Sequence, residues 1–194
     1  MLPLILGSGS PRRRDLLAQA GLAFEVLAAD IDESALPGEA PRALAERLAR
    51  QKASAVALRL GTAPRRFVLG ADTIVVVDGD VLGKPVDPED AVRLLSRLVG
   101  RVHDVVTGVA LVASDAPERA DTRVVASRVS MRRASEAEIR RYVATGEPLD
   151  KAGAYAAQGD GRRFIESIQG SETNVIGLPM DETLALLRAM GNGA

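Results

Sequence analysis

A group of hydroxyl and cationic side chains near the start of the chain is suited to binding an anion. Ser8 lies in a Gly/Ser turn, and residues 12–14 are all arginine. Ser10-Pro11 is a helix-start signal, so the arginines fall in the first turn of a predicted helix, where the backbone N–H groups are already partly positive. Three cations where carboxylates are preferred indicate a phosphate site. The alternative is that all three arginines point into water.

Two lysines and two carboxylates further along the chain have the chemistry to complete such a site. Lys52 lies at the edge of an apolar helix face, from which it either extends to water or projects into a cleft. Asp72 is flanked by strand-forming hydrophobic residues, and a buried carboxylate needs a partner or a metal. Glu33 lies in the acidic loop AADIDES, and Lys84 follows a predicted hairpin. Asp72 is therefore the best single candidate for a catalytic group.

These residue types together favour metal-assisted phosphoryl chemistry. Mg²⁺ typically takes one or two protein carboxylates and completes its shell with water and substrate phosphate. The cations would neutralise phosphate oxygens. A Walker loop is absent from the sequence, as is cysteine, and His103 is the only histidine, so we interpret it as structural. The residues alone predict a phosphate-ester or anhydride site and go no further.

Alternating helix and strand signals favour an α/β fold around these residues. Strands are predicted at residues 2–6, 24–28, 68–69, 74–77 and 81–82, and two long antiparallel strands at 103–113 and 123–131. Helices are predicted at 11–20, 41–60, 88–98, 135–144 and 183–190. In the second helix, the expected buried face is Leu44, Leu48, Ala55 and Leu58. Asp78-Gly79 predicts a hairpin turn, and Asp72 lies at an expected break between two strands.

The segment from Asp150 to Pro179 is rich in glycine and predicts a loop-rich region, with Asp181 as the cap of the closing helix. Gln158 lies among small residues in this segment. Its amide is well placed to meet a ligand edge. The alternative is that Gln158 merely satisfies a turn.

Composition limits the class of protein. The chain has 194 residues, 46% of them hydrophobic, and a net charge of −1. This length suits one large domain or two small lobes around a shared cleft. The near-zero charge gives no field to hold nucleic acid, and no apolar run is long enough for a signal peptide or a membrane span. The expectation is a soluble, cytoplasmic protein without nucleic-acid or membrane partners.

Six segments of the chain, taken in order, resemble the Maf family of nucleotide pyrophosphatases. They are GSGSPRRRDLL, DIDES, the lysine of ARQKA, LGADTIVVVDG, LGKP and DKAGAYAAQG…GSETNVIGLP, and the match as a whole runs from Leu4 to Pro179. The resemblance implies a single Maf-like domain over residues 1–194. It also implies an α/β fold like that of the inosine-triphosphate pyrophosphatases, with a mixed central sheet, flanking helices and two lobes around a deep cleft.

The resemblance implies an enzyme that hydrolyses a nucleoside triphosphate to monophosphate and pyrophosphate with a divalent cation, Mg²⁺ or Mn²⁺. Ser8, Arg12 and Arg13 correspond to the phosphate-binding motif SxSPRR. Lys52 and Lys84 correspond to the two lysines of the family and are predicted to be catalytic. Arg14 is then the arginine expected to face water.

The two carboxylates receive roles in the same way. Asp72 corresponds to the proton acceptor of the GADT motif and would take a proton from the water that attacks the α-phosphorus. Glu33 corresponds to the acidic-loop residue. Both are candidate metal ligands. Because a carboxylate held tightly by Mg²⁺ is a poorer base, Glu33 is the firmer candidate.

The segment KAGxYxxQG resembles the branch of the family that acts on dTTP and UTP. Arg12, Thr73 and Gln158 match the positions linked to base choice, and Gln158 would pair with uracil or thymine. Two residues depart from the pattern, because Glu172 replaces an aromatic and Ala157 replaces a common isoleucine. An acid near the pocket mouth could alter the nucleotide range.

Three alternatives stay open at this stage. One is a nucleotide-binding regulator of septum formation that needs no turnover, and another is a pyrophosphatase for 7-methyl-GTP. The third, a nucleic-acid-binding module, is disfavoured by the scarcity of aromatics and the balanced charge. The long strands between His103 and Met131 offer an edge for a homodimer.

Overall fold

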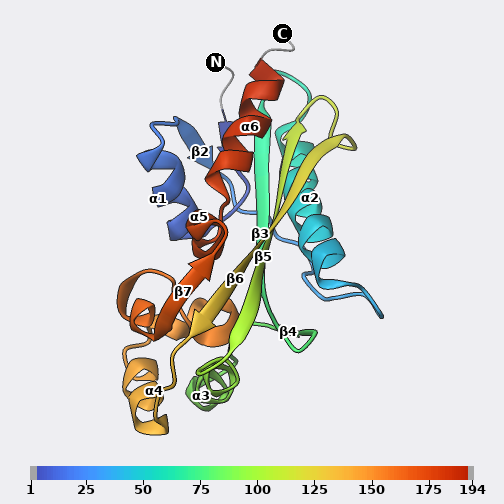
Figure 1. Ribbon diagram of the computed structural model, residues 1–194. Helices are drawn as coiled ribbons and strands as arrows, with labels where there is room; N and C mark the ends of the chain where they lie inside the picture. The colour runs from blue at the N-terminus through green and yellow to red at the C-terminus, as the bar shows by residue number, and fades with distance from the viewer. Residues whose placement is uncertain (1–3, 192–194) are drawn as a thin grey trace. The chain divides into compact units, whose positions relative to one another are not determined.

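The computed structural model describes residues 4–191, which form a mixed α/β structure (Figure 1). The strands are β1 (Leu4–Leu6), β2 (Phe24–Val26), β3 (Phe67–Val77), β4 (Asp80–Leu82), β5 (Val102–Ala113), β6 (Ala120–Met131) and β7 (Ile165–Gln169). The helices are α1 (Pro11–Gln19), α2 (Pro41–Leu60), α3 (Pro88–Ser96), α4 (Glu136–Val143), α5 (Glu172–Ile176) and α6 (Met180–Gly191). Short 3₁₀ turns cover Glu147–Asp150, Ala152–Ala154 and Gly159–Phe164.

The strands form one mixed sheet in the order β2-β1-β3-β5-β6-β7, with β4 paired to β3. β1 is parallel to both β2 and β3, whereas β3 with β4 and β6 with β7 are antiparallel. The predicted α/β class with a mixed sheet and flanking helices is confirmed. Among residues 4–191, none of the helices has the length and apolar character needed to cross a lipid bilayer.

The chain divides into two compact units. Unit 1 contains the described residues up to Asp72, the segment Thr107–Val125 and the described residues from Gly177 onward. Unit 2 contains Thr73–Val106 and Ala126–Ile176. The chain therefore passes from one unit to the other within β3, within β5 and within β6.

In unit 1, helix α2 packs directly on the sheet because two strand residues lack a side chain. A Cβ atom at Gly70 would lie 2.3 Å from the carbonyl oxygen of Ala49, and one at Gly108 would lie 2.2 Å from that of Ala45. Only glycine leaves room for the helix backbone at these positions. Figure 1 shows α2, in cyan, running alongside the upper parts of β3 and β5. This close packing brings residues of α2 up to β3.

In unit 2, helices α3 and α4 pack together and cover a separate hydrophobic core, which includes Leu95, Ile139, Tyr142 and Phe164. Both helices begin with a side-chain cap. The carboxylate of Asp87 accepts from the N–H of Asp90 at 2.7 Å, and the Ser135 hydroxyl accepts from the N–H of Glu138 at 3.3 Å.

Several local predictions were wrong in detail. Leu58 is 67% exposed, because the stripe of α2 that meets the sheet runs through Ala53, Val56 and Ala57. β3 has no break at Asp72 and continues as a strand through it. Ser10 occupies the N-cap position of α1 without a side-chain capping bond.

The C-terminal third of the chain also differs from the prediction. It contains β7 and α5, which the glycine content concealed, and α6 begins at Met180. β7 pairs with Arg128–Met131, and β5 lies between β3 and β6. These parts of the long strands therefore offer no free edge for a homodimer. Of the strand predicted at residues 2–6, residues 2 and 3 lie outside the described residues.

Candidate active site

Unit 1 places one lysine between two carboxylates. The Nζ atom of Lys52, on α2, lies 2.6 Å from Oδ1 of Asp72 on β3 and 2.8 Å from Oε1 of Glu33 in the loop after β2. Lys52 is 8% exposed and Asp72 is 7% exposed, whereas the Glu33 side chain is half-exposed. The lysine therefore turns inward from the edge of its helix. The close approach of α2 to Gly70 is what places it against Asp72.

Arg13 is the second buried cation of unit 1, and it bonds three different segments. Its Nη1 donates to the Ser8 hydroxyl and to the Ala71 carbonyl, each at 2.9 Å, and its Nε donates to the Gly177 carbonyl at 2.8 Å. Burial lowers the pKa of the Arg13 guanidinium, while the negative charge of Asp72 acts in the opposite direction. Arg13 thus ties the turn before α1 to the residue beside Asp72.

The turn between β1 and α1 presents the remaining residues of the predicted phosphate motif. Ser8 is buried, and its hydroxyl also accepts from the N–H of Ser10 at 3.3 Å. Arg12 is half-buried, whereas Arg14 is exposed. The predicted outward position of Arg14 is confirmed. The three arginines therefore have three different environments on one helical turn.

The other predicted site residues belong to unit 2. Thr73 follows Asp72 in β3, Lys84 lies in the loop after β4, and Gln158 precedes a 3₁₀ turn. Lys84 and Gln158 are exposed, and neither side chain has a hydrogen-bond partner within residues 4–191. Gln158 therefore does not satisfy a turn with its side chain.

A backbone bond joins the two loops that carry Lys84 and Gln158. The N–H of Gly153 donates to the carbonyl of Gly83 at 3.0 Å. Gly153 has a φ of +69°, and a Cβ there would lie 3.0 Å from Val75. Glycine at this position lets the loop of Gly153 approach β3 closely.

The carboxylates of unit 1 have the right chemistry for a hard divalent cation. Each ion pair with Lys52 uses one carboxylate oxygen, Oδ1 of Asp72 and Oε1 of Glu33. Such oxygen donors suit Mg²⁺ or Mn²⁺, which need only one or two of them when substrate phosphate and water fill the shell. Over residues 4–191 there is no cluster of three or more His, Cys, Asp or Glu side chains that could hold a metal alone. The donor set fits a cation shared with a phosphate ligand.

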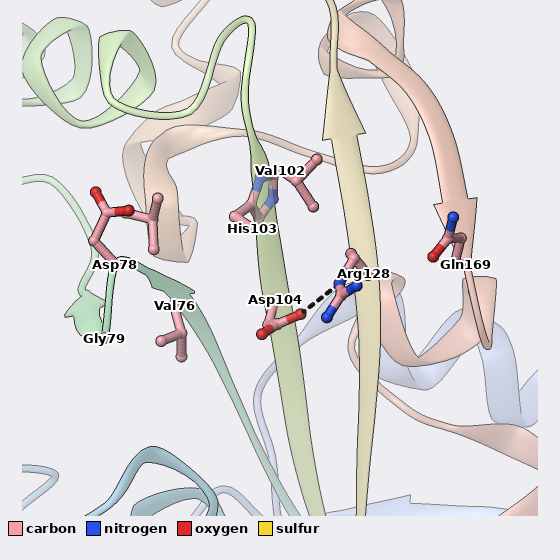
Figure 2. A pocket seen from close by; sticks show the side chains of 9 residues that line it. Val76, Asp78, Gly79, Val102, His103, Asp104, Arg128 and Gln169 are labelled. Carbon is pink, nitrogen blue, oxygen red and sulfur yellow. Dashed lines mark ion pairs between the residues drawn. The ribbon is translucent and has the colours of Figure 1, made fainter.

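An open pocket of about 520 Å³ lies in unit 2 (Figure 2). Its lining contains none of the predicted site residues. It is formed by residues of β3, β5, β6 and β7 and the hairpin turn after β3. Arg128 points toward Asp104 there, with 3.6 Å between Nε and Oδ1. Asp78, the third charged residue of the lining, pairs with Arg101 at 2.6 Å, so each charged side chain that lines the pocket has a partner of opposite charge.

His103 has a structural environment. It is 2% exposed, its Nε2 lies 2.7 Å from the Tyr155 hydroxyl, and the two rings meet edge to face at 5.4 Å. Burial lowers the pKa of His103 to about 4, and the charge of Asp104 opposes this only in part. The side chain is therefore neutral at pH 7.

Sequence reasoning missed two polar residues that hold unit 2 together. Asn174 is fully buried and donates to the Val105 carbonyl and the Ser127 hydroxyl, each at 2.9 Å. The Glu147 carboxylate accepts from the backbone N–H groups of Asp160 and Gly161. A signal for Glu147 was present, since it directly follows Gly146 and precedes Pro148, where a chain reversal is expected.

Comparisons with known proteins identify the family of the chain. Residues 3–190 match the family model described as Maf-like protein. A dTTP/UTP pyrophosphatase of Anaeromyxobacter dehalogenans (strain 2CP-C) is 54% identical over 97% of this chain and 94% of its own length. Those of Myxococcus xanthus and Hahella chejuensis are 52% and 50% identical, each over 97% of this chain and 92% of its own length.

Proposed function

Because this chain belongs to the Maf family, we propose that it hydrolyses dTTP and UTP to the monophosphate and pyrophosphate. The observation that carries the proposal is that relatives about half identical over nearly the whole chain are named dTTP/UTP pyrophosphatase. The group formed by Glu33, Lys52 and Asp72 supports the same class of reaction, because it combines a buried carboxylate with a cation and an oxygen donor for a metal.

In the proposed reaction, Asp72 accepts a proton from the attacking water. The water oxygen forms a bond to the α-phosphorus, and the bond from the α-phosphorus to the bridging oxygen breaks as pyrophosphate leaves. Lys52 holds Oδ1 of Asp72 at 2.6 Å, which fixes the carboxylate on β3. A base held in one orientation avoids part of the entropic cost of reaching the transition state.

The cations of the predicted site are proposed to bind the triphosphate. Arg12 and Ser8, at the start of α1, would contact phosphate oxygens directly, where the helix dipole adds to their effect. Arg13 would add positive charge and hold Ser8 in place through its 2.9 Å bond. Lys84, which has no side-chain partner within the described residues, would bind the charge that develops on the leaving pyrophosphate.

A divalent metal, Mg²⁺ or Mn²⁺, is proposed to bind at Glu33, with Asp72 as a second donor. When bound, such an ion would neutralise triphosphate oxygens and polarise the phosphorus. The half-exposed position of the Glu33 side chain supports it as the main ligand, because water and phosphate can reach the ion there. We expect Glu33→Gln to raise the metal concentration needed for half-maximal activity.

Base choice is proposed to depend on Arg12, Thr73 and Gln158. An exposed amide without a protein partner can donate to and accept from the edge of uracil or thymine. A base that leaves the amide unpaired would bind less well.

The test is pyrophosphate release from a panel of nucleoside triphosphates with Mg²⁺ or Mn²⁺. We expect dTTP and UTP to be the preferred substrates and each reaction to yield one monophosphate. Binding of nucleotides without release from any of them would overturn the enzyme proposal and favour a regulatory role. Preference for 7-methyl-GTP over UTP would overturn the substrate assignment alone.

A further inference from the structure

We infer that Glu147 is a positioning residue for base recognition: its carboxylate clamps the backbone that follows Gln158 and so fixes where the Gln158 amide points. This inference rests on the proposed function, since it gives Gln158 the role of reading the base. It concerns contacts within unit 2 alone.

The clamp consists of two backbone bonds to one carboxylate. Oε1 of Glu147 accepts from the N–H of Asp160 at 3.1 Å, and Oε2 accepts from the N–H of Gly161 at 2.8 Å. Hydrogen bonds to an ionised acceptor are about twice as strong as those between neutral groups. Both oxygens therefore act on residues two and three positions after Gln158.

The glycine beside Gln158 is needed for the carboxylate to come this close. A Cβ at Gly159 would lie 2.0 Å from Oε1 of Glu147, and the residue has a φ of +72°. Neither the space nor the backbone conformation accommodates another L-residue readily. The sequence QGDG thus combines the exposed amide of Gln158 with a backbone that follows the carboxylate of Glu147 closely.

The residues before Gln158 are held from the same side. The Tyr142 hydroxyl accepts from the N–H of Ala156 at 3.1 Å. Burial, together with the nearby Glu147 carboxylate, raises the pKa of the Tyr142 hydroxyl. Tyr142 is fully buried on α4, so the clamp is anchored in the core of unit 2.

Glu147 is itself held in place. Its N–H donates to the Thr145 hydroxyl at 3.2 Å, and its carbonyl accepts from Nζ of Lys151. The segment of Ala156–Gly161 is therefore fixed on both sides of Gln158, while the Gln158 side chain itself has no partner within residues 4–191. Such an arrangement leaves the amide exposed but restricts the backbone that carries it, as recognition of a base edge requires.

The test compares Glu147→Gln with Glu147→Asp and with Glu166→Gln, a matched change at an exposed carboxylate on β7 that accepts from the Ser130 hydroxyl and not from a backbone N–H of residues 4–191. In Glu147→Gln, an NH₂ group replaces one acceptor and faces a backbone N–H. We expect the ratio of kcat/KM for UTP over CTP to fall about tenfold, through KM for UTP, the size of effect that one lost charge-assisted bond gives. Glu147→Asp keeps both carboxylate oxygens, so its ratio of kcat/KM for UTP over CTP should lie between those of Glu147→Gln and the wild type.

Equal losses for UTP and CTP would overturn the inference, because a purely structural role lowers both in proportion to the folded fraction. Amide hydrogen exchange gives a second readout that needs no activity. We expect exchange over residues 156–161 to rise in Glu147→Gln and to stay unchanged in Glu166→Gln. Unchanged exchange in Glu147→Gln would overturn the clamp. A wild-type protein that released no pyrophosphate would instead overturn the proposed function, and the exchange result would still decide whether the clamp exists.

Discussion

The two units differ in the kind of polar group that they bury. Among the described residues, the buried charged side chains are Arg13, Lys52 and Asp72, and all three belong to unit 1. The buried polar residues of unit 2 are neutral: His103, Ser127 and Asn174. The burial of a charge requires a partner of opposite sign, whereas a neutral group needs only a hydrogen bond. The candidate catalytic residues Lys52 and Asp72 are therefore a buried and paired set of charges in unit 1.

Unit 2 carries its candidate recognition residues on the surface instead. Lys84 and Gln158 are exposed, and their positions depend on backbone bonds made by neighbouring residues. For two of the proposed roles this difference gives a division that can be tested: regular elements of unit 1 hold the candidate base Asp72 and its partner Lys52, and a short turn of unit 2 holds Gln158, the candidate reader of the base. Five substitutions or conditions test this division.

The largest expected effect is that of Asp72→Asn. We expect kcat for UTP to fall by about 10³-fold or more, because an amide cannot accept the proton from water. Glu33 remains beside Lys52, so the fold should persist. Asp121→Asn, at an exposed position on β6, serves as the matched control, and both variants should keep the circular dichroism spectrum of the wild type. Substantial activity in Asp72→Asn would show that another group is the base.

Lys52→Met tests the buried charge of unit 1 directly. Removal of the cation leaves the buried carboxylate of Asp72 without its partner, and we expect the free energy of unfolding to fall by about 3 kcal/mol. Arg50→Met changes an exposed cation on the same helix, and its free energy of unfolding should stay within about 0.5 kcal/mol of the wild-type value. Urea unfolding at pH 7 measures both. Equal stability of the two variants would contradict the partner role of Lys52.

Arg13→Lys keeps the charge but loses the planar group that reaches Ser8, Ala71 and Gly177. We expect the free energy of unfolding to fall by about 2 kcal/mol, since one ammonium cannot reproduce the three bonds. Arg12→Lys should instead raise KM for the triphosphate with little change in unfolding. If Arg13→Lys changed only KM, Arg13 would act in phosphate binding, and its bonds to Ser8, Ala71 and Gly177 would not stabilise the fold.

Because unit 2 buries His103 in its neutral form, we expect the stability of the protein to depend on pH. The pKa of His103 is lowered from 6.5 to about 4, so the unfolded chain binds a proton between these values that the folded chain does not. Its contribution to stability is therefore full above about pH 6.5 and is lost as the pH falls toward 4. Between pH 7 and pH 5 we expect a loss of about 2 kcal/mol that is absent in His103→Asn, measured by urea unfolding at both values.

In unit 1, the sequence identified charged residues that the structure brings together, but not the packing that brings them together. Helix α2 was predicted with its observed ends, because Pro41 and Gly61 mark them, and Lys52 was recognised at the edge of its apolar face. Which way the lysine turns depends on Gly70 and Gly108, whose meaning appears only when α2 and the strands meet. The exposure of Leu58 has the same origin, since the contact with the sheet, and not hydrophobicity alone, selects the buried stripe.

In unit 2, the sequence located Gln158 but not what holds it. The bonds from Asp160 and Gly161 to Glu147 join residues thirteen and fourteen positions apart, and no helical or strand period links them. β7 and α5 were missed for a related reason, because glycines at their borders hid two short elements that form only by pairing with β6 and packing on unit 2.

The smallest expected effect separates the two units most clearly. Gln158→Ala removes an exposed amide that has no partner within the described residues, so the free energy of unfolding should not change. We expect the preference for UTP over CTP to fall about tenfold, the size of effect of one lost hydrogen bond to a buried base edge, with kcat for the poorer substrate unchanged. Measurements of kcat and KM for both nucleotides decide the matter. A uniform fall in kcat would place Gln158 with the reactive groups and would contradict the division between the two units, because a residue that only reads the base has no contact with the phosphorus where the bond breaks.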